Sequence, residues 1–200
     1  MGAEIKKKKD NTRQILVLGL AGAGKSFLLK KLLDMYEKDI KEVQLESTLG
    51  FNQIKIDYLS KELTLWDLGG DQITRSYWAT FYRNLKVDIV IFIINLGDEE
   101  NNKLKSLKEL LNCISEEELK AAKFFVLFNY ILEDKDQKKN NAKETKFKED
   151  KELLLEDLKE NVIHDMDNRL DFDLFDISKL KQGEIKSIEL MNKMFGVEKK

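Results

Sequence analysis

The chain has 200 residues, a formal net charge of −2 and one cysteine, Cys113. This length suits a single domain with a sizeable core, and the near-neutral charge excludes the strongly basic class of nucleic-acid binders. A lone cysteine excludes an intrachain disulfide, so we expect a reducing, cytoplasmic environment and a Cys113 side chain packed in the core.

Apolar periodicity predicts strands that alternate with helices. Residues 1–12 are polar and are expected to form a flexible tail, followed by a single domain over residues 13–200. We expect strands at residues 13–18, 51–58, 62–67, 87–94, 124–128 and 172–177, and helices at residues 25–37, 73–84, 101–113, 153–163 and 184–195. Residues 38–50 are expected to form a loop. The pattern predicts an α/β fold with a mainly parallel six-stranded sheet flanked by helices, plus one antiparallel edge hairpin at residues 51–67.

Residues 133–152 differ from the rest of the chain because only Ala142 and Phe147 are apolar there. So few apolar side chains bury too little surface to order a segment on their own. We therefore expect a charged, mobile inserted loop. Its charges serve either as solvated surface or as a surface for docking a partner.

The strongest motif is GLAGAGKS at residues 19–26, between an apolar run and an amphipathic run. It fits the phosphate-binding pattern G-x-x-x-x-G-K-[ST] and predicts a P-loop NTPase, because its glycines let backbone N–H groups point at phosphate oxygens. We expect Lys25 to reach the β- and γ-phosphates and Ser26 to bind Mg²⁺. The expected nucleotide contacts are Gly19, Ala21, Gly22, Ala23, Gly24, Lys25, Ser26 and Phe27.

Two further segments suit a Mg²⁺-nucleotide site. Asp67 ends a predicted strand in WDLGG, where a carboxylate can hold Mg²⁺ through water beside a glycine loop that approaches the γ-phosphate. Thr48 lies in STLGF, before the preceding strand, and could bind Mg²⁺ only when the γ-phosphate is present. The predicted metal ligands are Ser26, Thr48 and Asp67, and the Thr48 loop is predicted to be a switch.

Together with SEEELKAAKFFVLFN, these motifs resemble the Arf and Arf-like branch of the Ras-type small GTPases, well over residues 13–130 and loosely beyond. The resemblance implies GTP or GDP as ligand and a Gly70 backbone N–H that senses the γ-phosphate. It also implies that Phe51, Trp66 and Phe81 bind protein effectors, although core packing explains these aromatic residues as well.

The chain departs from the family at the hydrolytic position. The family has glutamine directly after the second glycine, whereas this chain has Asp71 followed by Gln72. An ionised carboxylate adds negative charge near the γ-phosphate and cannot donate a hydrogen bond. We therefore expect slow or absent intrinsic hydrolysis, unless a one-residue shift of the loop lets Gln72 orient the attacking water.

The guanine-reading motif N-K-x-D is also altered. Asn129 is present, Tyr130 replaces the lysine and could stack on the base, and Leu132 replaces the aspartate that accepts hydrogen bonds from guanine. This loss predicts weaker base discrimination, unless Glu133 or Asp134 substitutes. Ser178 and Lys179 match the third base-contacting element of the family.

The N-terminus lacks the membrane signals of the family. Gly2 is present, but Lys6 stands where a myristoylation signal has serine or threonine, and the first twelve residues have no apolar face. Four lysines alone do not make a stable anchor, which usually needs two signals. We expect no stable membrane attachment.

Three functions are compatible with these features. The leading hypothesis is an Arf-like switch that binds Mg²⁺-GTP and Mg²⁺-GDP and hydrolyses GTP slowly or with a helper protein. The alternative is a degenerate scaffold subunit of a larger assembly, which the resemblance would place in the cilium or cytoskeleton. A P-loop kinase or ATPase is disfavoured, because no arginine lies in residues 133–152, where a phosphate-clamping lid would be expected.

Overall fold

The structure is a computed structural model, and it describes residues 12–36, 40–46, 50–130, 137–161 and 168–197. The strands are β1 (Thr12–Leu18), β2 (Ile40–Glu46), β3 (Phe51–Tyr58), β4 (Lys61–Leu68), β5 (Ile89–Asn95), β6 (Lys123–Asn129) and β7 (Leu170–Phe175). The α-helices are α1 (Lys25–Met35), α2 (Gln72–Arg75), α3 (Trp78–Asn84), α4 (Glu100–Ser115), α5 (Gln137–Asn161) and α6 (Ile185–Met194). Two single turns of 3₁₀-helix, η2 (Glu117–Leu119) and η4 (Ile177–Lys179), complete the elements.

The sheet confirms the predicted fold class and adds one strand. Its order is β2-β3-β4-β1-β5-β6-β7, with parallel pairing from β4 to β7 and antiparallel pairing among β2, β3 and β4. The seventh strand, β2, lies within residues 38–50, which were predicted to be a loop. The register of β2 against β3 shifts between Ile40 and Glu42, so its apolar residues do not alternate along the whole strand. That irregularity explains why periodicity missed it.

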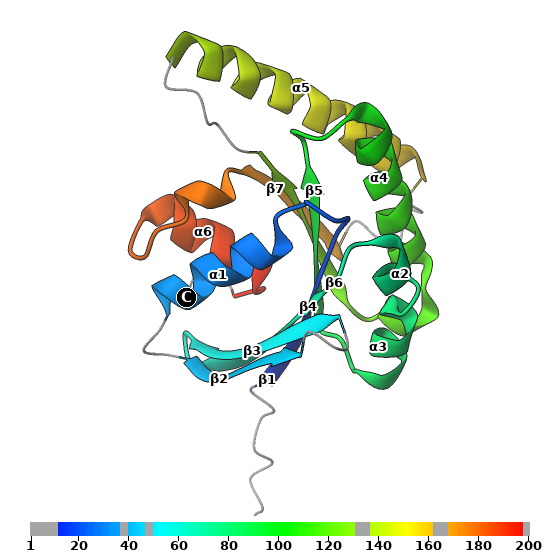
Figure 1. The fold of residues 1–200 in the computed structure, drawn as a ribbon, viewed down its shortest axis with the longest axis vertical. Helices are drawn as coiled ribbons and strands as arrows, with labels where there is room; N and C mark the ends of the chain where they lie inside the picture. The colour runs from blue at the N-terminus through cyan, green and yellow to red at the C-terminus, as the bar shows by residue number, and fades with distance from the viewer. Residues whose placement is uncertain (1–11, 37–39, 47–49, 131–136, 162–167, 198–200) are drawn as a thin grey trace, which may run out of the picture.

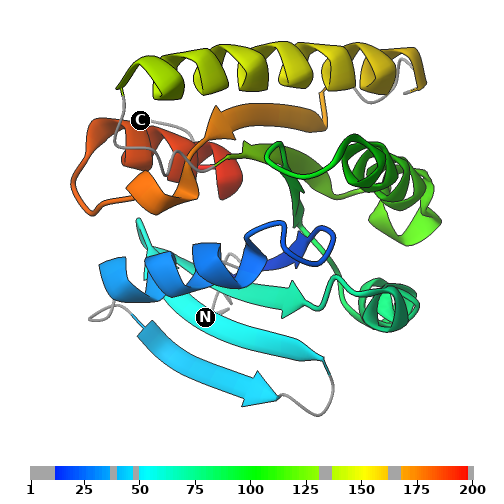
Figure 2. The ribbon, with the colours of Figure 1, turned by 45° about the horizontal axis from the view of Figure 1, so that its top comes forward.

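Helices cover both faces of the sheet (Figures 1 and 2). On one face α1 and α6 enclose a core that includes Leu28, Leu32 and Met191. On the other face α3, α4 and α5 enclose a second core. The central strand β5 is apolar on both sides, as its run of β-branched residues predicted, because each face meets a different core. Cys113 of α4 is 4% exposed, which confirms that it packs in the core.

Residues 137–152 correct the prediction of an inserted loop, because they form the first part of the long helix α5. Phe147, Leu154, Leu155 and Leu158 recur at helical spacing and are all buried. Lys103 of α4, itself 4% exposed, donates to Asp150 of α5 at 2.7 Å. Tertiary packing therefore orders the helix, and the polar composition of residues 137–152 did not predict it. No helix among the described residues has the length and apolarity needed to span a bilayer.

Candidate functional site

The tight turn between β1 and α1 depends on the backbone conformation of Gly24. This residue has φ of 105° in the left-handed region, and an added Cβ would lie 2.7 Å from Asn129 Nδ2. A side chain at position 24 would therefore be both strained and crowded. Gly24 leads directly into the first turn of α1, so the turn is shaped as a concave backbone surface at a helix N-terminus.

Lys25 is held inside this turn. Its side chain is 7% exposed, and Nζ donates to the carbonyl oxygens of Gly19 and Leu20, both at 2.9 Å. Burial lowers the pKa of Lys25, while the nearby carboxylates of Asp67 and Asp71 oppose that shift. Among the described residues, the hydrogen-bond acceptors of this ammonium are both neutral carbonyls, and a buried ammonium so placed is suited to bind an anion such as a phosphate.

Asp67 and Ser26 form the expected cation-binding part of the site. Asp67 is 3% exposed, and its Oδ2 accepts hydrogen bonds from Ser26 Oγ at 2.9 Å and Asn52 Nδ2 at 3.2 Å. Its Oδ1 is buried and accepts no hydrogen bond from the described residues, and burial raises the pKa of the Asp67 carboxyl. Asn52 was not predicted, although it faces Asp67 in the β3–β4 register.

These residues fit Mg²⁺ on chemical grounds. The ion is usually held by one or two carboxylates together with waters and phosphate oxygens. Here one buried carboxylate oxygen beside a serine hydroxyl accepts no hydrogen bond from the part of the chain that the structure describes, and that part contains no cluster of three or more acidic, histidine or cysteine ligands. Ser26 and Asp67 would therefore hold the ion only together with a phosphate-bearing ligand.

Gly70 lies directly against the phosphate-binding turn. Its carbonyl accepts from Ala21 N at 3.0 Å, and an added Cβ would lie 2.3 Å from the Gly19 oxygen and 2.5 Å from Lys25 Nζ. No other residue type fits there without moving the backbone. The segment that follows β4 is thus in contact with the residues expected to bind phosphate.

Asp71 serves as the N-cap of α2. Its carboxylate accepts from Ile73 N and Thr74 N at 3.0 Å each, and from the Thr74 hydroxyl. These hydrogen bonds, that of the Thr74 side chain first, lower the pKa of Asp71, so it stays ionised and cannot donate. Gln72, one residue on, is exposed at the start of the helix.

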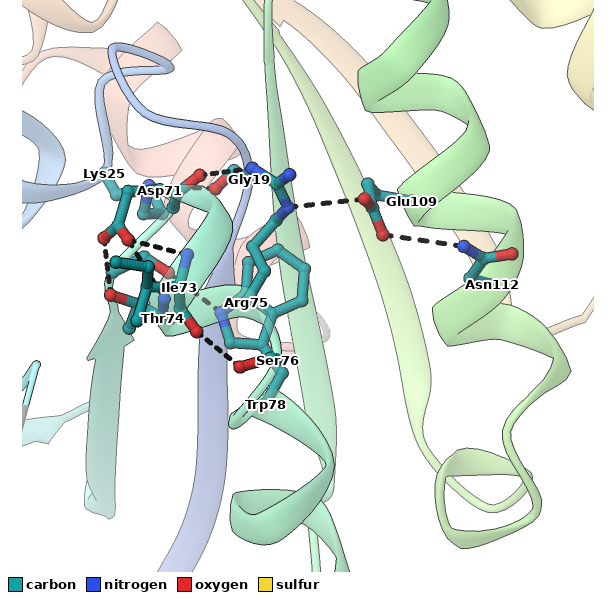
Figure 3. A network of polar contacts seen from close by, with 12 residues as sticks. Gly19, Lys25, Asp71, Ile73, Thr74, Arg75, Ser76, Trp78, Glu109 and Asn112 are labelled. Atoms are coloured by element: carbon teal, nitrogen blue, oxygen red, sulfur yellow. Dashed lines mark hydrogen bonds and ion pairs between the residues drawn. The ribbon is translucent and has the colours of Figure 1, made fainter.

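Arg75 joins this segment to α4 and was not predicted. Its Nη1 donates to the Gly70 oxygen at 2.8 Å, and its Nε lies 3.3 Å from Glu109 Oε1. Figure 3 shows Asp71 facing the start of α2 while Arg75 extends toward Glu109. Trp78 Nε1 also donates to the Gly69 oxygen at 2.9 Å. Both glycine carbonyls are therefore fixed by side chains from α2 and α3.

The other predicted base-contacting residues lie at the ends of β6 and β7. Asn129 is 2% exposed, donates from Nδ2 to Ala23 O at 3.1 Å, and accepts at Oδ1 from Ile177 N at 3.3 Å. Tyr130 packs against Phe147 with ring centroids 5.2 Å apart. Asn129 thereby ties the phosphate-binding turn to η4, which contains Ser178 and Lys179.

The structure brings the three predicted effector-binding aromatics together. Phe51 lies 5.8 Å from Trp66 and 5.1 Å from Phe81, centroid to centroid. All three are partly exposed and also pack against the core under α3 and α4. They form a half-buried aromatic cluster at the junction of β3, β4 and α3.

Some predicted residues and segments fall outside the described residues. Thr48, Leu132, Glu133 and Asp134 are among them. So is the polar tail, apart from Thr12, which begins β1. The remaining predicted phosphate contacts, which include Gly22 and Phe27, all lie on the β1–α1 turn or the first turn of α1.

The chain is similar to proteins of one known family. The profile of the ADP-ribosylation factor family matches residues 2–179. ADP-ribosylation factor-like protein 1 of Drosophila melanogaster is 37% identical over 58% of this chain, and ADP-ribosylation factor-like protein 2 of Dictyostelium discoideum is 36% identical over 62%. The matches span 60% and 62% of the length of those two relatives.

A solved structure of the Arl6 BBS3 small GTPase from Trypanosoma brucei, with the bound nucleotide analogue GppNp, is similar in fold. The TM-score is 0.56 at 18% identity, covering 92% of this chain and 94% of that one. At that identity the likeness supports the fold alone.

Proposed function

Because the chain belongs to the ADP-ribosylation factor family, we propose that it is a small GTP-binding protein that holds Mg²⁺ with GTP or GDP and acts as a molecular switch. One observation carries the proposal. The buried Lys25 ammonium and the Asp67 Oδ1, to which no described residue donates, flank the same glycine turn, where a phosphate and a cation would neutralise both.

In this proposal the phosphates lie on the β1–α1 turn, with Lys25 and the first N–H groups of α1 as donors. Ser26 and Asp67 hold Mg²⁺, which neutralises phosphate charge when bound. A γ-phosphate would meet Gly70 beside Lys25, since that is where the chain after β4 touches the turn. The contact between Gly70 O and Ala21 N would then have to rearrange, which moves α2 and its surroundings.

The same proposal includes slow hydrolysis. Asp71 is ionised and its oxygens are bonded to Ile73 and Thr74, so it offers no donor to orient a water. Turnover would then depend on a helper protein. The half-buried aromatic cluster of Phe51, Trp66 and Phe81 is the proposed effector surface, because it lies between the strands and the helix that border the moving segment.

A specific observation also supports a second candidate function, a scaffold subunit that keeps the fold without cycling. The hydrolytic position is committed to capping α2, and Leu132 stands where the family reads guanine. Such a subunit would bind nucleotide without exchanging or hydrolysing it, or would bind none.

Nucleotide content and nucleotide exchange together separate these possibilities. The protein is purified with Mg²⁺ and denatured, and the released nucleotide is identified by chromatography; exchange is followed with labelled GDP added to the folded protein. Bound nucleotide that exchanges supports a switch, with hydrolysis blocked if it is GTP and active if it is GDP, whereas bound nucleotide that does not exchange supports the scaffold. Lys25→Ala should abolish binding, whereas the exposed Lys30→Ala on the same helix should not. A folded wild-type protein that binds neither nucleotide contradicts the switch.

A further inference from the structure

A cavity lies along the edge of the sheet, and its lining includes two of the predicted base-contacting residues, Tyr130 and Lys179. The cavity measures about 1050 Å³, follows β7, and is lined by Tyr130, Asp176 and Lys179 together with residues of α5 and α6. Figure 2 shows β7 between α5 and α6 at the edge of the sheet. A polar side chain that lines this cavity can therefore contact a ligand.

Asp176 follows the last residue of β7 and lies next to the base-contacting residues. The final register pair of β6 and β7 is Asn129 with Phe175, so Tyr130 and Asp176 are the residues that directly follow this pair. Asn129 Oδ1 also accepts from the N–H of Ile177. Because Asn129 in turn holds Ala23 of the phosphate-binding turn, Asp176 has a fixed position relative to that turn.

The two carboxylate oxygens of Asp176 have different environments. The side chain is 2% exposed, and Oδ1 accepts from the N–H of Ser178 at 3.0 Å and from the Ser178 hydroxyl. Oδ2 is buried and accepts no hydrogen bond from the described residues, and its nearest cation is Lys179 Nζ at 3.6 Å. A buried carboxylate oxygen that accepts no hydrogen bond lowers the stability of the folded protein. A ligand that donates a hydrogen bond to Oδ2 would remove that cost.

We infer that Asp176 Oδ2 reads the base of the bound nucleotide by accepting a hydrogen bond from guanine, in place of the aspartate that the family has at the position of Leu132. Guanine carries N–H donors at N1 and N2, whereas adenine has an unprotonated acceptor at N1 and only a C–H at C2. A carboxylate that faces these two positions therefore selects guanine. This inference rests on the proposed nucleotide binding and adds the residue that determines its specificity.

The test is the isosteric change Asp176→Asn. The amide oxygen can keep the Ser178 hydrogen bonds while the free oxygen becomes an NH₂ donor. We expect affinity for GDP to fall about 10- to 100-fold, because a charge-assisted hydrogen bond is lost. We expect affinity for xanthosine diphosphate to rise, because xanthine has an acceptor oxygen where guanine has its amino group. Asp171→Asn is the matched control, since Asp171 lines the same cavity and also accepts from a backbone N–H.

The outcomes are distinguishable. A shift from guanine to xanthine in Asp176→Asn, with Asp171→Asn unchanged, supports the inference. GDP binding with the same base preference in wild type and Asp176→Asn overturns it but leaves the proposed function standing. A wild-type protein that binds GDP and ADP equally also overturns it, and that measurement needs no variant to fold. If wild type binds no nucleotide at all, the proposed function fails first.

Discussion

The substitution Asp67→Asn probes the expected Mg²⁺ site most directly. The Asp67 carboxylate is expected to destabilise the folded protein when no cation is bound, and to be required for binding Mg²⁺. Asp67 is 3% exposed, and its Oδ1 accepts no hydrogen bond from the described residues, which without a bound cation costs about 1–3 kcal/mol. The hydrogen bonds from Ser26 and Asn52 and the charge of Lys25 offset part of that cost. We therefore expect the variant to be more stable in EDTA by about 1 kcal/mol, a rise in Tm of about 2–4 °C.

With Mg²⁺ and GDP present the order should reverse. A ligand at a hundred times its Kd stabilises the folded state by about 2.7 kcal/mol, and the variant loses most of this if Asp67 holds the ion. Thermal unfolding of wild type, Asp67→Asn and the exposed control Asp34→Asn, each in EDTA and in Mg²⁺-GDP, measures both effects. A variant that is less stable than wild type in EDTA, or equally stabilised by Mg²⁺-GDP, refutes the reasoning.

The pH dependence of this difference has a definite sign. Burial raises the pKa of Asp67 in the folded state above 3.8, so the folded protein binds a proton more readily than the unfolded chain. The cost of the charge is therefore present above the folded pKa and disappears as the pH falls through it toward 3.8. In EDTA the stability advantage of Asp67→Asn should shrink over that window, and Mg²⁺ affinity of wild type should weaken there as protons compete. A constant difference across the window would contradict the assignment.

Three other experiments, two with variants and one with the wild-type protein, test further parts of the structure. Phe147→Ala should lower the free energy of unfolding by about 3 kcal/mol in urea titrations because a buried aromatic contact of α5 is lost; a change below about 1 kcal/mol would contradict the packing of that helix. Asp71→Gln should raise intrinsic GTP hydrolysis at least about tenfold in single-turnover assays by supplying a hydrogen-bond donor; an unchanged rate would show that position 71 does not limit hydrolysis. Burial raises the pKa of Cys113 to about 12, so its reaction with a thiol reagent at pH 8 should follow unfolding, and rapid labelling of the folded protein would argue against that burial.

Local patterns in the sequence were sufficient for most of the fold. Strand β5 is recognisable because its β-branched run is buried on both faces. The β1–α1 turn is recognisable because its backbone adopts positive φ values that favour glycine. Strand β2 and the first half of α5, which were not predicted, depend on distant partners. Strand β2 has an interrupted alternation, and the first half of α5 has few apolar side chains, of which Phe147 finds its contact on Tyr130.

In the candidate site, too, some features follow from local sequence and others only from tertiary contacts. Lysine, serine and aspartate at set spacings in the chain determined which groups would surround a phosphate and a cation, since strand–turn–helix geometry is local. Only the tertiary structure decided how neighbouring groups are used. Asp71 became a helix cap because α2 begins beside it, and Asp176 came next to Asn129 because β6 and β7 pair in register. Hydrogen-bond partners that are far apart in the chain follow from strand pairing and helix packing, and no local pattern encodes them.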